Sequence, residues 1–250
     1  MQGSYAQMPV AREANADHFF RNLNDYKNNY SRMASYQAIH REVSAAVAGV
    51  DQLLDIGNGG IFNYDTGSVR KITAVDLFLG QIAPALLNGY FPSNVIVRTG
   101  DALRLEQADA SFDASLIVML LHHLVGETVE QSIANTRQAL GEAWRVIKPG
   151  GRLILVESCV PSWFYAFERV VFRAAAKMIT ASLEHPPTLQ YPTELILSIL
   201  RELSPDVTIR PIPLGRWVIQ LGFFWPTALT PIGAYLFTAV KPMTAIADEG

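Results

Sequence analysis

The segment 53–60 limits the possible folds of this chain more than any other stretch. It reads Leu-Leu-Asp-Ile-Gly-Asn-Gly-Gly, so an apolar run is followed by an acid, Asp55, and then by a glycine cluster. Glycines directly after a strand let the backbone turn tightly and approach a ligand closely. A second apolar run closes on Asp76, twenty-one residues after Asp55, which is where a ribose-binding acid falls in a mononucleotide-binding half. The pair predicts a nucleotide-cofactor loop, although the glycines alone are equally consistent with a plain tight turn.

This loop does not match the sequence pattern of dinucleotide-binding loops. Its order is Asp55-x-Gly57-x-Gly59, without the final G-x-x-G spacing, which disfavours pyrophosphate binding. An acid at a strand end followed by glycine backbone suits a ligand with an amino-acid head and a nucleoside tail. Main-chain amides near a helix start can hold a carboxylate, and Asp55 can accept a hydrogen bond from an ammonium group. The two oxygens of Asp76 can accept from both hydroxyls of a ribose.

Further motifs follow in order along the chain. The run 95–99 ends on Gly100-Asp101-Ala102, and an acid there can accept from the exocyclic amine of an adenine. Another apolar run, 114–121, leads into His122-His123. Apolar residues at helical spacing predict a helix from 129 to 147. Pro-Gly-Gly at 149–151 then predicts a turn, and 153–156 the next strand.

This order of motifs resembles the class I S-adenosylmethionine-dependent methyltransferases, most closely the small-molecule type of ubiquinone/menaquinone and natural-product methylation. The resemblance covers roughly residues 50–160. It implies an α/β fold: a Rossmann-like sheet, mostly parallel with an antiparallel C-terminal strand, with helices on both faces and a helical lid insertion. It also implies S-adenosyl-L-methionine as cofactor, and no metal. One departure is that Ile61 stands where the family's third glycine is expected, and 62–67 is short and polar for a first helix.

The resemblance and the motifs together assign the site. The expected cofactor-binding residues are Tyr30, Asp55, Gly57, Asn58, Gly59, Asp76, Leu77, Asp101, Ala102 and Met119. If the acceptor is a hydroxyl, His122 or His123 with Glu157 could supply general-base catalysis. In similar sugar- and phenol-methylating enzymes, a His at this motif and an acid after the fifth strand act together. The alternatives are that the His pair only caps a strand end and that Glu157 only anchors a neighbouring loop.

The length and composition of the chain limit how many domains it can form. A chain of 250 residues that is half hydrophobic can bury one sizeable core. We expect a single domain with an N-terminal helical cap (1–48), a cofactor-binding core (50–160), a helical lid insertion (161–205) and C-terminal strands (206–241). A net charge of −3 argues against a nucleic-acid substrate. A single cysteine, Cys159, excludes an intramolecular disulfide and fits a cytoplasmic protein, and the N-terminus lacks the apolar core of a secretion signal.

The stretch 217–240 carries no charge and is long enough to raise the question of a membrane span. Pro226 and Pro231 break it into pieces. Its last part, 234–240, predicts the final strand of the sheet, with 207–210 as its neighbour. We therefore expect no transmembrane segment.

Acceptor recognition is expected outside the core. Trp163, Phe164 and Phe167 begin the insertion, and Phe223, Phe224 and Trp225 follow later; all six either line an acceptor pocket or pack as core. Three cations in the insertion, Arg169, Arg173 and Lys177, share one helix face, which is either solvated or touches anionic lipid. Near the N-terminus, Tyr26, Tyr30 and Tyr36 could close over the cofactor.

The predicted function is methyl transfer to a small, fairly apolar acceptor, most readily an oxygen of a natural product or related metabolite. Transfer to nitrogen or carbon is the alternative within this class. Two other classes stay open: a nicotinamide-dependent oxidoreductase, which the missing G-x-G-x-x-G disfavours, and a protein of this fold that binds the cofactor without transferring methyl. A homo-oligomer is compatible with the sequence.

Overall fold

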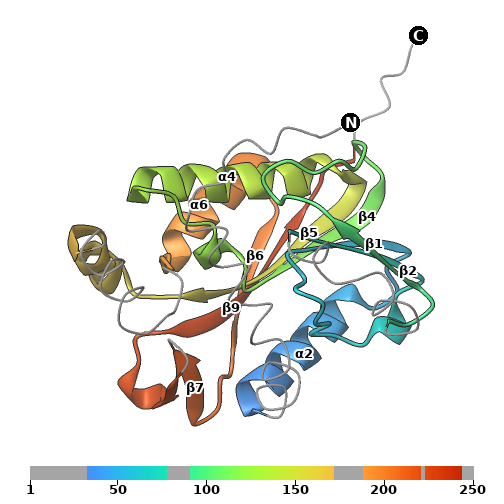
Figure 1. Cartoon of the computed structure of the whole chain (residues 1–250). Coiled ribbons are helices and arrows are strands. Elements are labelled where there is room, and N and C mark those ends of the chain that lie inside the picture. Colours follow the sequence, from blue (N-terminus) through green and yellow to red (C-terminus); the bar gives the residue numbers. More distant parts are fainter. Residues whose placement is uncertain (1–32, 78–90, 172–187, 221–222, 244–250) are drawn as a thin grey trace.

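The computed structural model describes residues 33–77, 91–171, 188–220 and 223–243. Seven strands form one sheet in the order β3-β2-β1-β4-β5-β9-β6 (Figure 1). The strands are β1 (Gln52–Ile56), β2 (Lys71–Asp76), β3 (Val95–Thr99), β4 (Phe112–Val118), β5 (Ile147–Cys159), β6 (Val207–Ile212) and β9 (Gly233–Val240). Strands β1 to β5 pair in parallel, whereas β9 runs antiparallel between β5 and β6. The predicted sheet with an antiparallel C-terminal strand is therefore confirmed.

The uncharged stretch 217–240 divides as its prolines indicated. Its first part forms a separate two-stranded ribbon of β7 (Trp217–Gln220) and β8 (Phe223–Pro226), followed by a short 3-10 turn, η5 (Thr227–Leu229). Its last part is β9, which pairs with β5 and with β6, as predicted for 234–240 and 207–210. Within the described ranges, no helix is long and apolar enough to cross a membrane.

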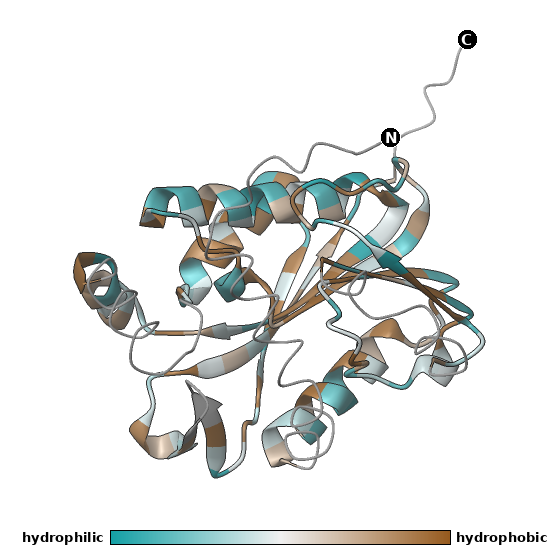
Figure 2. Cartoon of the chain, in the orientation of Figure 1, coloured by the Kyte–Doolittle hydropathy of each residue, from teal (hydrophilic) through white to brown (hydrophobic). Residues whose placement is uncertain are grey.

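Helices cover both faces of the sheet (Figure 1). On one face lies α2 (Ala34–Val47), and on the other lie α4 (Val129–Arg145) and α6 (Thr193–Leu203). Helix α4 is capped by Thr128, whose hydroxyl accepts a hydrogen bond from the Gln131 backbone N–H and so satisfies one free donor of the first turn. Figure 2 shows polar and apolar residues alternating along α2 and α4, as expected for helices with one face on a sheet.

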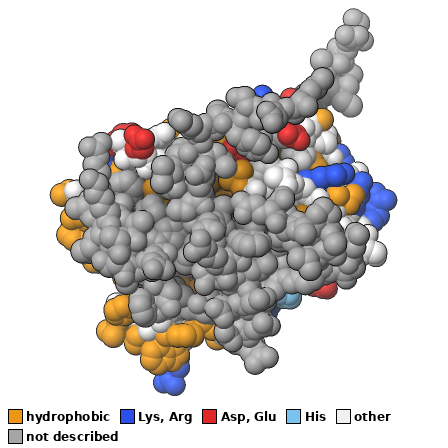
Figure 3. Space-filling model, viewed as in Figure 1, with side chains coloured by type: hydrophobic (Ala, Val, Ile, Leu, Met, Phe, Trp, Pro, Cys, Tyr) orange, Lys and Arg blue, Asp and Glu red, His pale blue; other side chains and the backbone are white. Residues whose placement is uncertain are grey.

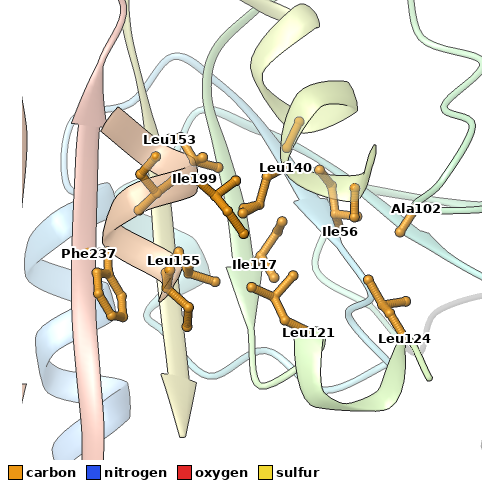
Figure 4. Close-up of a cluster of buried hydrophobic side chains, with 14 of the residues drawn as sticks. Ile56, Ala102, Ile117, Leu121, Leu124, Leu140, Leu153, Leu155, Ile199 and Phe237 are labelled. Atoms are coloured by element: carbon orange, nitrogen blue, oxygen red, sulfur yellow. The ribbon is translucent and has the colours of Figure 1, made fainter. Parts of the chain in front are cut away.

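Each face of the sheet carries its own hydrophobic core. The α4/α6 core is shown in Figure 4, and its labelled members are Ile56, Ala102, Ile117, Leu121, Leu124, Leu140, Leu153, Leu155, Ile199 and Phe237. The α2 core includes Ile39, Val43, Leu53, Ile72 and Leu116. Buried residues from neighbouring strands meet in both cores, so the strands are held in a fixed register and the loops at their ends have a rigid base.

Two boundary predictions are wrong. The helix predicted over 129–147 ends at Arg145, and Ile147 is the first residue of β5. Pro-Gly-Gly at 149–151 does not separate helix from strand but lies inside β5, where Phe112 pairs with Ile147 and Ala114 with Arg152. The four residues 148–151 thus lie opposite one residue of β4, which is a bulge.

The connection from β1 to β2 contains no α-helix. Between Ile56 and Lys71 the only regular element is a 3-10 turn, η2 (Thr66–Ser68). The expectation that a helix start follows the glycine loop is therefore wrong, and the polar segment 62–67 had signalled it. On this side of the sheet α2 packs against Leu53 and Ile72 instead, so a helix from before β1 covers the face.

The predicted lid, 161–205, has two parts of different character. Residues 162–171 are helical and follow the end of β5. Helix α6 packs into the α4/α6 core through Ile196, Ile199 and Leu200, so this half of the segment is part of the layer that covers the sheet. The cations Arg173 and Lys177 lie outside the described residues.

Candidate active site

The expected site residues gather at the carboxyl edge of the parallel strands. Asp55 is in β1, Asp76 ends β2, and Met119 follows β4. Backbone bonds tie these ends together: Gly57 N donates to Val75 O at 2.8 Å, and Met119 N donates to Val156 O at 2.8 Å. Ligands of open α/β sheets bind at this edge.

Asp55 is the centre of a buried hydrogen-bond network. Its side chain is 2% exposed, and its Oδ2 accepts from Asn58 Nδ2 at 2.5 Å and from the Tyr64 hydroxyl at 2.9 Å. Burial raises the pKa of Asp55 to about 7, although the hydrogen bonds from Tyr64 and Asn58 oppose the rise. Tyr64 was missed by sequence reasoning because it lies in the segment read as a weak first helix.

Asn58 offers the clearest fit for an ammonium group. Its amide nitrogen donates to Asp55 and to the Ile61 carbonyl at 3.0 Å. Its Oδ1 is buried, and no donor within the described part of the chain reaches it. Because an unsatisfied buried acceptor is costly, a ligand donor beside it would be stabilised.

A cavity adjoins this acceptor. It is lined by Asp55, Gly57, Asn58, Ile61, Asn63, Tyr64 and Val118. The walls thus combine the buried carboxylate of Asp55, the amide oxygen of Asn58 and glycine backbone. The two oxygens can accept hydrogen bonds, so this combination suits the amino-acid end of S-adenosylmethionine. The residues present fit that cofactor.

Asp76 and the glycine loop are joined directly. The Gly59 backbone N–H donates to Asp76 Oδ2 at 2.9 Å. Gly57 and Gly59 have φ values of 71° and 62°, a region that glycine adopts without strain. A side chain at Gly57 would also collide with Leu120, since its Cβ would lie 2.5 Å from a Leu120 methyl carbon. Ribose binding by Asp76 stays a prediction, and one of its oxygens already holds the loop.

The adenine-side residues follow β2 and β3. Leu77 comes directly after β2 and is partly exposed. Asp101 Oδ1 accepts from Leu103 N at 2.8 Å, which fixes the turn after β3, and Ala102 is buried in the α4/α6 core. Their contacts with a cofactor stay predictions. Tyr30 lies outside the described residues.

A His–Glu pair lies at the ends of β4 and β5. His122 Nδ1 is 2.6 Å from Glu157 Oε1, and Glu157 is 0% exposed. Glu157 also accepts from the Leu121 N–H at 2.7 Å and the Ser158 N–H at 2.8 Å. These donors hold the carboxylate in place, so His122 is fixed through Nδ1 and its Nε2 is the ring nitrogen left to exchange a proton.

The second histidine occupies a different position. The rings of His122 and His123 are 4.1 Å apart, and His123 is partly exposed. The direct partner of Glu157 is His122. Between β4 and this pair, Met119 has a φ of 53°, a conformation that costs a side-chain-bearing residue about 1–2 kcal/mol. Such strain is typical of functional positions.

Sequence reasoning missed a polar extension of this pair. Ser158 Oγ lies 2.7 Å from Gln190 Oε1 and 3.2 Å from Glu157 Oε1. Gln190 lies in the segment between the predicted lid helix and α6, and the Leu189 N–H donates to the His122 carbonyl at 3.0 Å. No local motif marks Gln190, because the contact arises only when the chain returns to the sheet edge.

Comparison with known proteins agrees with this geometry. Residues 54–155 match the family described as "Methyltransferase domain". The chain is 37% identical over 100 residues to a demethylmenaquinone methyltransferase of Paenarthrobacter aurescens, covering 39% of this chain and 36% of that protein. It is 30% identical over 139 residues to the ubiquinone/menaquinone biosynthesis C-methyltransferase UbiE of Rubrivivax gelatinosus, covering 56% and 47%. In both cases the match spans less than half the length of the curated relative.

Solved structures share the fold. The N-methyltransferase NodS of Bradyrhizobium japonicum, crystallised with S-adenosyl-L-homocysteine, superposes with a TM-score of 0.59 at 15% identity, over 91% of this chain and 99% of that chain. At this identity the likeness concerns the fold alone. The match of residues 54–155 to a methyltransferase domain agrees with the motif order and with this fold, and the curated relatives that the chain resembles are named as methyltransferases of menaquinone and ubiquinone.

Proposed function

We propose that this protein transfers a methyl group from S-adenosylmethionine to a small, fairly apolar acceptor that must lose a proton, most readily a hydroxyl oxygen. The observation that carries the proposal is the contact between His122 Nδ1 and the fully buried Glu157, at 2.6 Å. A histidine fixed in this way can take a proton from an acceptor at the same sheet edge.

The bound cofactor supplies a methyl group already activated by its sulfonium. The chain's own residues would hold this cofactor and take up the acceptor's proton. Asn58 Oδ1 and Asp55 would hold the ammonium end, Asp76 and Asp101 would hold the nucleoside end, and the backbone of Gly57 would keep the loop close. His122 receives the acceptor's proton at Nε2, while Glu157 orients the ring and stabilises the imidazolium that forms. Holding the acceptor in line with the methyl group contributes several kcal/mol or more by orientation alone.

Carbon methylation is the second candidate. Both curated relatives described above act in quinone biosynthesis by their printed names, and one is named a C-methyltransferase. A phenolic ring carbon becomes nucleophilic when the neighbouring hydroxyl is deprotonated, so the same His122–Glu157 pair would serve it. The two candidates differ in the atom that gains the methyl group.

The test uses S-adenosylmethionine with a deuterated methyl group and a panel of phenols, hydroquinones and primary amines. Mass spectrometry and NMR of the product identify the methylated atom. We expect phenols or hydroquinones to gain one label, and both His122→Ala and Glu157→Gln to lower kcat about 100-fold or more with cofactor affinity unchanged. Amine-only labelling, or full turnover in both variants, would contradict the proposal.

Binding of the cofactor without transfer is distinguished in the same experiment. An enzyme produces S-adenosylhomocysteine in proportion to methylated acceptor. A protein that only binds the cofactor releases it unchanged with every member of the panel, and that result would also count against the proposal.

A further inference from the structure

The β7–β8 ribbon is an addition between β6 and β9 that carries exposed aromatic residues. Trp217 and Phe224 are 54% and 59% exposed, and Trp225 is 46% exposed. Leu229, in the 3-10 turn that follows, is 75% exposed. Figure 3 shows hydrophobic side chains gathered at the lower left, where Figure 1 draws this ribbon. Large apolar groups that cluster on a surface in this way mark an interaction site.

The pairing of the ribbon explains which side chains face outward. Trp217 pairs with Pro226, and Val218 with Trp225. Because side chains alternate along a strand, Trp217 and Pro226 lie on the face opposite Val218. Val218 is buried against the α2 core, so Trp217 faces away from the protein. Phe224, two residues before Pro226 on the same strand, shares the outer face.

The stretch of chain that contains the ribbon carries basic residues but no acidic ones. Residues 207–247 contain no aspartate or glutamate. Arg216, next to Trp217, is exposed, and its carbonyl accepts from the Thr227 N–H to close the base of the ribbon. None of the ion pairs between described residues involves Arg216. An exposed arginine beside an exposed tryptophan, in a stretch of chain that carries no acidic residue, is complementary to a negatively charged surface.

The ribbon lies on the same side of the molecule as the active site. Gly233, the first residue of β9, pairs with Cys159, the last residue of β5. The turn that joins the ribbon to β9 therefore reaches the carboxyl edge of the sheet, near Glu157. The helical residues 162–171 leave β5 at that edge too, with Trp163 and Phe167 exposed, so neither is core.

We propose that the outer face of the β7–β8 ribbon, with Trp217 and Phe224, together with the exposed Arg216 at its base, docks this protein on an anionic lipid bilayer. Tryptophan and phenylalanine enter the boundary between headgroups and acyl chains, while the arginine meets lipid phosphate. A second copy of the chain fits less well, because a two-stranded ribbon presents a narrow ridge and a stable protein interface needs about 800 Å² from each partner. Docking in this orientation brings the active-site edge toward the membrane, from which an apolar acceptor could enter.

The test is flotation of the full chain with unilamellar vesicles, without cofactor or acceptor, so its outcome does not depend on methyl transfer. One vesicle set contains phosphatidylcholine alone, and the other contains phosphatidylcholine with phosphatidylglycerol. We expect binding to the anionic vesicles, at least about tenfold weaker binding to the neutral ones, and a decline with added salt. Trp217→Ser with Phe224→Ser should reduce binding to the anionic vesicles by about tenfold or more.

The matched control is Met243→Ser. Met243 is 75% exposed and follows the far end of β9, so it lies at the opposite edge of the sheet, and its loss should leave vesicle binding unchanged. If the double variant fails to fold by circular dichroism, Arg216→Glu carries the test and must weaken binding to anionic vesicles. Absence of vesicle binding, equal binding of wild type and variants, or a dimer that the ribbon variants abolish would each overturn the proposal.

Discussion

Replacement of Tyr64 by phenylalanine probes the buried network beneath the glycine loop. The substitution removes one hydroxyl and keeps the ring, which contacts Phe62 edge-on with centroids 5.9 Å apart. The hydroxyl donates to Asp55 Oδ2 at 2.9 Å. Without it, the buried carboxylate of Asp55 retains the donor from Asn58. We therefore expect the variant to destabilise the charged form of Asp55 more than the neutral form.

The magnitude depends on pH. Burial raises the pKa of Asp55 from 3.8 to about 7 in the folded protein. The stability that this group contributes is therefore fully present below about pH 4 and is lost as the pH rises through about 7. A hydrogen bond to a charged group contributes about 1.5–3 kcal/mol, and a neutral one about 0.5–1.5 kcal/mol. Since one pKa unit corresponds to about 1.4 kcal/mol, Tyr64→Phe should raise the pKa of Asp55 by a further unit or so.

Urea unfolding of wild type and Tyr64→Phe between pH 5 and pH 9 measures the effect. The loss in free energy of unfolding should grow from about 1 kcal/mol at pH 5 to about 2–3 kcal/mol at pH 9. Tyr191→Phe is the matched control, because Tyr191 is buried and its hydroxyl donates to no carboxylate in the described part of the chain. The control should show no trend with pH. A pH-independent loss in Tyr64→Phe would refute the charged network.

Two further predictions concern the fold. Phe237→Ala, at a fully buried position of β9, should cost about 3–5 kcal/mol, whereas Phe224→Ala on the exposed ribbon should change the free energy of unfolding by less than about 0.5 kcal/mol; equal losses would contradict the assigned burial. Gly151→Ala should destabilise by about 1–3 kcal/mol, because its Cβ would lie 2.6 Å from a backbone oxygen of β4. Gly141→Ala, in the open middle of α4, should stabilise by roughly 0.5–1 kcal/mol, and thermal melting of both glycine variants checks the opposite signs.

The sheet was predictable because its strands carry their own signals. Apolar runs that close on Asp55, Asp76 and Asp101 mark parallel strands, and Pro226 indicated that the C-terminal stretch is not one continuous span. The helix boundary at Arg145 was missed because Ile147 fits a helical spacing and a buried strand equally well. Local pattern does not separate those two states at an element's end.

The site was predictable only in part, since its contacts join distant segments. His122 and Glu157 were paired by motif resemblance, and the structure brings them within 2.6 Å. Tyr64 and Gln190 gave no sequence signal, because each reaches the site through a loop whose path depends on tertiary packing. The polar segment 62–67 indicated that no helix follows β1. Only the structure shows that α2 covers that face of the sheet instead.

Isothermal titration with S-adenosylhomocysteine, S-adenosylmethionine and NAD determines which cofactor this chain binds. We expect both sulfur ligands to bind at one site and Asp76→Ala to weaken each by about 1–3 kcal/mol, or roughly 5- to 150-fold, through loss of the ribose acceptor. NAD should not bind, because the loop at Gly57 lacks the pyrophosphate fingerprint. Tight binding of NAD with no response to either sulfur ligand would contradict the assignment of this loop to S-adenosylmethionine.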